Sequence, residues 1–122
     1  MQLGLVELAV GGLTGWAMVL LVEHPGWLAR HGVRAPARIR QWHLDYLLMG
    51  LILVGVGLAI PDLAWPVAAA VAFGALVNPT LFLPLAFRPE VQGRAWYRAL
   101  TVVSFLAMSG GLVVVAAIAV AR

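Results

Sequence analysis

Two long stretches of this chain contain no charged side chain, one over residues 63–87 and the other over residues 99–121. Each is longer than the roughly 20 apolar residues with which a helix crosses a bilayer. Hydrophobic residues make up 63% of the 122 residues and charged residues 11%, against roughly 25% charged in soluble domains. Lipid must therefore solvate much of the surface. The composition predicts an integral membrane protein and excludes a soluble enzyme, a disordered tail and a nucleic-acid-binding module, despite a pI near 10.7.

The hydropathy pattern predicts an all-α fold, a bundle of four transmembrane helices in a single membrane domain covering residues 1–122. The spans are expected at approximately 3–22, 44–61, 65–87 and 97–121, because only helices of this length satisfy every backbone group in lipid. A barrel of about eight strands would not fit in this length. The chain has no cysteine, which excludes disulfides and thiolate metal sites. Its first residues lack the positive charge of a signal peptide, so the first span is expected to remain in the mature protein.

The distribution of arginine predicts the orientation of the chain in the membrane. Seven of the eight basic residues, all arginine, are expected in the two connections on one side of the membrane: Arg30, Arg34, Arg38, Arg40, Arg88, Arg94 and Arg98. Only Arg122 falls on the other side. By the positive-inside rule, both arginine-rich connections should be cytoplasmic and both termini outside, in a bacterial inner membrane.

Small residues indicate where the helices approach one another. Gly11 and Gly15 are spaced for close packing in the first span, as are Ala107 and Gly111 in the fourth, and three glycines serve the second span. Four thin helices cannot enclose a large cavity alone. We therefore expect a homo-oligomer, with any ligand site between subunits.

His43 is the first candidate for chemistry. At helical spacing it shares a face with Leu47, Gly50 and Val54, which predicts a smooth slot beneath the imidazole. An axial nitrogen above a groove without side chains suits a haem. The alternative is an interfacial histidine bonded to lipid headgroups.

Three other polar side chains fall within the predicted spans or at their ends, where such groups are costly and often functional. Asp45 lies about 200° around the helix from His43, and either pairs with Arg38 or Arg40 or holds a ligand. Glu7 faces the packed side of its helix; it either snorkels outward or has a structural or proton-coupled role. Asn78 precedes Pro79 in the third span, and either repairs the helix break there or faces a pocket.

Several motifs together resemble the small membrane isomerases typified by hydroxylaminobenzene mutase and styrene oxide isomerase. Gly12-Leu13-Thr14-Gly15 is similar to a stretch of the family's first helix. Pro36-Ala37-Arg38-Ile39-Arg40, followed by His43-Leu44-Asp45 and then Gly50, resembles the family's loop and second-helix motif. Phe73-Gly74-Ala75-Leu76-Val77-Asn78 looks like its third-helix segment. The match spans most of the chain.

The resemblance implies four-helix subunits that assemble as trimers and hold haem b between them through the second-helix histidine, which is His43 by position. It implies Gly50 as a haem-packing position and Asn78 as a catalytic pocket group. Ferric iron with one open axial position would act as a Lewis acid on a small apolar epoxide drawn from the bilayer. Two positions depart from the family pattern: Met49 replaces an asparagine and Leu76 a tyrosine.

Three functional hypotheses follow. The first is a haem b-dependent membrane isomerase in which His43 binds iron and haem, Gly50 contacts haem and Asn78 contacts substrate. The second retains haem in a non-enzymatic sensor, carrier or electron-transfer protein, although the spans offer no second histidine for bis-ligation. The third is a small proton-coupled transporter that uses Glu7.

Overall fold

The computed structural model describes residues 1–122, and the whole of the ordered secondary structure is helical. Four segments are long and apolar enough to cross a membrane, which confirms the all-α fold with four spans. The third span is formed by two helices in succession, and short helices occupy the connections. The elements are α1 (Gln2–Glu23), α2 (Pro25–Arg30), α3 (Ala37–Ala59), α4 (Trp65–Thr80), α5 (Phe82–Phe87), the 3₁₀-helix η1 (Pro89–Gly93) and α6 (Ala95–Ala121).

The second span begins seven residues before the predicted boundary at residue 44. Arg38 and Arg40 therefore lie in the first turn of α3, not in the preceding loop. Arginine is a good helix former, and Pro36 stands just before the helix, where its missing N–H is not needed. The predicted boundary excluded charged residues from the span, but nothing after Pro36 prevents a helix. His43 consequently lies two turns inside α3.

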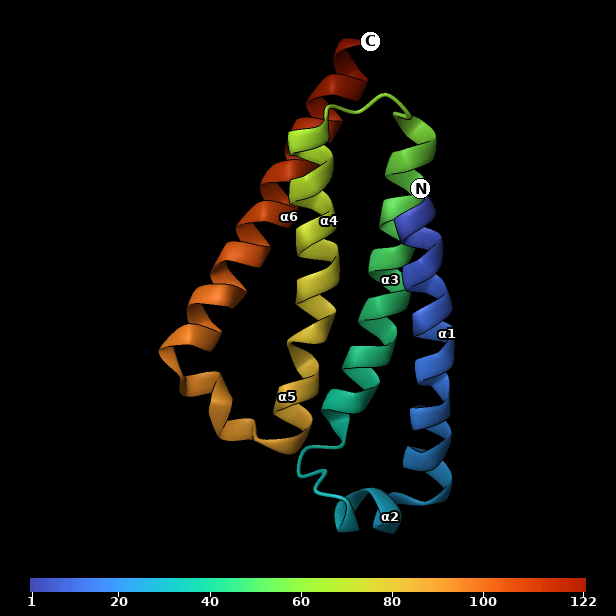
Figure 1. Ribbon diagram of the computed structural model, residues 1–122, viewed down its shortest axis with the longest axis vertical. Helices are drawn as coiled ribbons and strands as arrows, with labels where there is room; N and C mark the ends of the chain where they lie inside the picture. Colours follow the sequence, from blue (N-terminus) through green and yellow to red (C-terminus); the bar gives the residue numbers. More distant parts are fainter.

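The four spans form an open layer in the order α1, α3, α4, α6, shown in Figure 1. Each helix packs on its neighbour in this order, and the two outer helices make no extensive contact with each other. The predicted bundle is thus not closed. Large apolar side chains are exposed along all four spans, as expected for a surface that faces lipid or another subunit.

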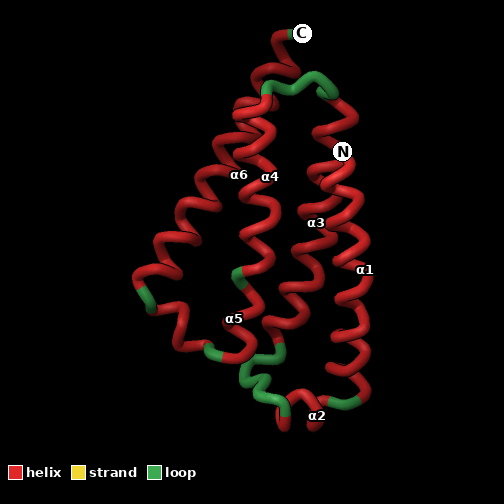
Figure 2. The backbone as a smooth tube through the Cα atoms, in the orientation of Figure 1, coloured by secondary structure: helices red, strands yellow, loops and turns green.

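The ends of the layer are tied by ion pairs. In Figure 2 the two long connections lie at one end, with the short turn after α3 and both termini at the other. Arg34 Nη1 lies 3.2 Å from Glu90 Oε2 and joins the two long connections. At the opposite end Arg122 binds Asp62 at 3.0 Å, and the hydrogen bond from Arg122 holds the pKa of Asp62 below its usual value.

Glycine lets α1 and α3 approach until their backbones touch. A Cβ atom at Gly4 would lie 2.8 Å from the Gly50 carbonyl oxygen, and one at Gly50 would lie 2.8 Å from Leu8 Cγ. Gly11 packs in the same way on Leu47. On the other side of the layer, Gly74 and Gly111 bring α4 against α6. The prediction that small residues mark the helix contacts is confirmed at Gly11, Gly50 and Gly111. At Gly55 of the second span, by contrast, a Cβ would meet no atom within 4 Å.

The helix of the third span is interrupted between its two prolines, and a break at the first of them, Pro79, was predicted. Pro79 and Pro84 each lack the N–H that would continue the helical ladder, and α4 ends at Thr80 before α5 begins. The Tyr97 hydroxyl of α6 donates a 2.7 Å hydrogen bond to the Leu81 carbonyl at the break. The break therefore places one polar contact between α6 and the third span.

The contact between α1 and α3 makes a testable prediction. Gly50→Val should lower the free energy of unfolding by about 1–3 kcal/mol, because the added atoms overlap Leu8 and the Gly4 backbone. Unfolding in detergent, followed by circular dichroism, measures the effect. Gly55→Val on the same helix is the control and should change stability much less. Equal effects of the two substitutions would show that Gly50 is not in close contact with α1.

Candidate functional site

His43 is held by α1 through the nitrogen Nδ1 of its imidazole. Nδ1 lies 2.9 Å from the Gly11 carbonyl oxygen and 2.8 Å from Thr14 Oγ1. A carbonyl oxygen only accepts hydrogen bonds, so Nδ1 carries the proton and donates it. Thr14 in turn donates to the same carbonyl at 2.6 Å. The ring also rests against Gly15, where a Cβ atom would lie 3.5 Å from Cε1. Three residues of α1 thus fix the orientation and tautomer of one histidine.

The second ring nitrogen of His43, Nε2, is left with no hydrogen-bond partner, and it is not among the buried unpartnered atoms. In the neutral ring Nε2 has the free lone pair that binds a metal. A metal-binding histidine usually donates its other N–H to a carbonyl or carboxylate, as His43 does. The residues present therefore fit one axial ligand of a haem. No group of three or more His, Asp or Glu side chains placed to hold a metal ion is found within one copy of the chain.

Gly50 does not form the predicted open slot beneath His43. Both residues face α1, and Leu8 and Gly4 fill the space over Gly50. The reason is physical: the same absence of a side chain that would admit a porphyrin also admits a neighbouring helix. Within one protomer, Gly50 is a helix-packing residue. The predicted contact between Gly50 and haem is therefore blocked by α1 in a single copy of the chain.

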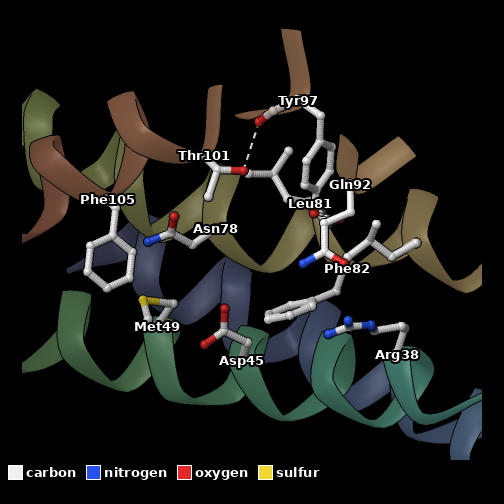
Figure 3. Close-up of a pocket in the computed structure, with 11 residues that line it drawn as sticks. Arg38, Asp45, Met49, Asn78, Leu81, Phe82, Gln92, Tyr97, Thr101 and Phe105 are labelled. Carbon is white, nitrogen blue, oxygen red and sulfur yellow. Dashed lines mark hydrogen bonds between the residues drawn. The ribbon is translucent and has the colours of Figure 1, made fainter. Parts of the chain in front are cut away.

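Asn78 lines a cavity on the other side of α3. The cavity has a volume of about 310 Å³ and lies between α3, the two helices of the third span, η1 and α6 (Figure 3). Its lining residues are Arg38, Asp45, Met49, Asn78, Leu81, Phe82, Leu85, Gln92, Tyr97, Thr101 and Phe105. Of the two alternatives for Asn78, the structure supports the one in which it faces a pocket.

A buried serine fixes the amide group of Asn78. Ser104 on α6 has no exposed surface, and its hydroxyl donates a 2.6 Å hydrogen bond to Asn78 Oδ1. That length is usual for O–H···O and short for N–H···O, which supports the placement of the oxygen toward Ser104. The amide N–H₂ of Asn78 is therefore the group that is free to act in the cavity. The Ser104 hydroxyl also lies 3.1 Å from the Thr101 carbonyl oxygen of its own helix, and no motif in the sequence pairs Ser104 with Asn78.

Asp45 also lines this cavity, on the opposite side of α3 from His43, as helical spacing predicted. Of the two alternatives for Asp45, the ion pair with Arg38 or Arg40 is not formed: the ion pairs of the structure are Arg34–Glu90 and Arg122–Asp62. Arg38 instead donates to Gln41 Oε1 at 2.8 Å. In Figure 3 the ring of Phe82 is seen between the carboxyl group of Asp45 and the guanidinium of Arg38. Asp45 is left without a hydrogen-bonding partner in the protein.

His43 and Asn78 are not brought together within one protomer. His43 faces α1 and does not line the cavity that contains Asn78, whereas Asn78 faces α6 across the layer. Met49, at the position where the resembled family has an asparagine, lines the Asn78 cavity and makes it less polar. A single site containing both candidates would need two copies of the chain.

Glu7 is buried in α1, with an exposed fraction of 2%. Neither of its carboxyl oxygens has a hydrogen-bond partner. The prediction that Glu7 faces packed helix is confirmed, and the alternative that it snorkels outward is wrong. A buried carboxyl group without a partner is costly, so Glu7 stands out as a group whose role its packing does not explain.

Comparison with known protein families, with curated proteins and with solved structures found no match to this chain. Its site must therefore be interpreted from its own geometry.

The bond between Ser104 and Asn78 makes a second prediction. Ser104→Ala should lower the free energy of unfolding by about 1–3 kcal/mol, because the Asn78 oxygen loses its partner in a partly buried position. Ser109→Ala is the matched control on α6, since Ser109 is exposed and bonds only the Phe105 carbonyl of its own helix. Thermal unfolding of both variants in one detergent measures the difference. Equal effects would show that the Ser104 bond does not hold Asn78.

Proposed function

We propose that this chain is a haem b-binding integral membrane protein of a bacterial inner membrane, with its arginine-rich connections in the cytoplasm and its termini outside. In this proposal His43 Nε2 is the axial ligand of the haem iron. The protein resembles the styrene oxide isomerase and hydroxylaminobenzene mutase family in its motifs, and isomerisation of a small apolar, epoxide-like substrate is the proposed activity.

The observation that carries the proposal is the hydrogen bonding of His43. Gly11 and Thr14 hold Nδ1 as a donor, so Nε2 keeps a lone pair in a fixed direction. This is the arrangement in which histidine binds a metal most firmly, because the ring cannot rotate and its tautomer is set. The other two histidines do not offer such a ligand: His24 and His31 are exposed, and His31 stacks on Trp27.

A homo-oligomer follows from where the candidates lie. His43 and Asn78 are on different sides of α3, so a catalytic site that uses both is proposed between two copies of the chain. The open layer of helices leaves its outer faces free for such contacts. The trimeric form of the proposal rests on the family resemblance.

When bound through His43, a ferric haem would supply a Lewis acid. Residues of the chain would orient the iron ligand and the substrate and would exclude water. Gly11 and Thr14 orient His43, and Ser104 orients Asn78 so that its amide donates toward a substrate oxygen. The apolar lining that includes Met49 and Phe105 would exclude water from the substrate. If the assembled copies do not bring Asn78 toward the iron, the same His43 geometry serves a non-enzymatic haem carrier, sensor or electron-transfer protein.

The proposal predicts a Soret absorption band in protein purified in detergent. The band should disappear in His43→Ala and persist in the control His24→Ala. Thr14→Val should lower haem affinity by roughly tenfold or more, since ligand-orienting partners typically contribute that much. Haemin titration followed by absorbance measures all three variants. A wild type that gives no band after reconstitution would overturn haem binding.

Incubation of the haem-loaded protein with styrene oxide then distinguishes the enzyme from the carrier. Phenylacetaldehyde formation that is lost in Asn78→Leu, with the Soret band retained, would support the isomerase. A haem-loaded protein that forms no aldehyde would favour the non-enzymatic alternative.

Glu7 supports a second candidate function, a proton-coupled transporter. The unpartnered carboxyl group inside a membrane span is where a proton or cation could bind during transport. In cells that express the wild type, resistance to ethidium should rise, and Glu7→Gln should abolish the rise. Glu23→Gln, which changes an exposed glutamate at the end of α1, is the control. Wild-type expression without any gain in resistance would contradict this candidate for ethidium-like substrates.

A further inference from the structure

The Asn78 cavity is polar at one end and apolar at the other. Arg38 and Gln92 lie at the end formed by the first turn of α3 and by η1. Further along the spans the lining becomes Met49 and Phe105. A second cavity of about 200 Å³ adjoins it there, shares Met49, Asn78 and Phe105 with it, and is otherwise lined by Ile52, Met108, Ser109 and Leu112. The two together form an elongated, largely apolar space with polar groups near one end.

Apart from Arg38 and Gln92 at the polar end, Asp45 and Asn78 in the first cavity have unused hydrogen-bonding capacity. The Asp45 carboxyl group makes no hydrogen bond and no ion pair in the structure, and as a carboxylate it only accepts. The Asn78 oxygen is taken by Ser104, so the amide N–H₂ is the part of Asn78 that remains, and it only donates. Figure 3 shows the amide nitrogen on the side of Met49 and Phe105. Beside the groups at the polar end, Asp45 therefore presents a free acceptor and Asn78 a free donor.

The formal charges of the cavity cancel. Asp45 contributes one negative charge and Arg38 one positive charge, and the bond that Arg38 makes is to the neutral Gln41. The Tyr97 hydroxyl donates to the Leu81 carbonyl, so toward a ligand it can only accept. A site with balanced charge and an apolar continuation favours a neutral molecule that partitions into the bilayer over a free ion.

We propose that this cavity binds a small neutral alcohol, an apolar body with one hydroxyl group. The hydroxyl donates to the Asp45 carboxylate and accepts from the Asn78 amide, and the apolar body lies against Met49 and Phe105. A hydroxyl group is both donor and acceptor, which satisfies both unused groups at once. An ammonium ion has no acceptor for Asn78. An ether or epoxide can accept from Asn78, as proposed for the isomerase substrate, but it leaves Asp45 unpaired. This inference does not depend on haem, because His43 lies on the other side of α3.

The test uses four probes of similar shape that differ in one group: para-fluorobenzyl alcohol, para-fluorobenzylamine, para-fluoroanisole and para-fluorotoluene. Fluorine NMR titrations of the full chain in detergent give a Kd for each, after subtraction of partitioning into empty micelles. The alcohol should bind at least about tenfold more tightly than each of the other three, since each leaves at least one group of the site unpaired. Because this comparison uses the wild type, it requires no variant to fold.

Two variants then test whether Asp45 and Asn78 are responsible for the preference for the alcohol. Asp45→Leu and Asn78→Leu should each reduce alcohol affinity by about tenfold, to near that of the toluene. Asp62, the only other aspartate, lies in the turn after α3, so Asp62→Asn should leave alcohol binding unchanged. The inference is overturned if the toluene or anisole binds as well as the alcohol, or if the alcohol preference survives both leucine substitutions. Tighter binding of the amine would overturn the preference for a neutral ligand.

Failure of this inference and failure of the haem proposal are distinguishable. Loss of the Soret band in His43→Ala concerns only the α1–α3 side of the layer. Alcohol binding is measured without haem, and it depends on residues that face α6.

Discussion

The close approach of α1 to α3 is the contact on which the rest of the site geometry depends. Gly4 and Gly50 allow the two backbones to touch, and Gly11 allows Leu47 to pack in the same seam. With the helices at this separation, the Gly11 carbonyl reaches the imidazole of His43. A larger residue at any of these glycines would move α1 outward and remove that hydrogen bond. A packing contact between small residues thus sets the chemical state of a histidine.

The same contact also determines which way Asp45 of α3 points. Because His43 faces α1, the helical repeat turns Asp45 toward the third span and α6. There it shares a cavity with Asn78, which Ser104 orients from α6. The two sides of α3 therefore differ in chemistry. One side has a histidine nitrogen with a free lone pair that could bind a metal, and the other side has a hydrogen-bonding cavity. An activity that combines them requires more than one copy of the chain.

The sequence predicted the spans and several local features well because these depend on short-range rules. Apolar length determines where a helix can cross a bilayer, and proline determines where the third span breaks. The opposite placement of His43 and Asp45 follows from helical spacing alone. The start of α3 was misplaced because arginine is tolerated in a first helical turn, so charge is a poor marker of a helix boundary. The role of Gly50 was wrong within the protomer because a bare helix face admits a helix as readily as a ligand.

What the sequence determined by itself is the environment and the outline: lipid as solvent, four helices, and a short list of polar residues that the membrane makes costly. What only the tertiary structure decided is how those residues are paired. Thr14 with His43, and Ser104 with Asn78, join residues that are 29 and 26 positions apart, and no spacing rule connects them. The lack of any partner for Glu7 or Asp45 is likewise a property of packing. Hydrogen bonds between helices depend on register and rotation, which are set by side-chain contacts along the whole interface and not by any one segment.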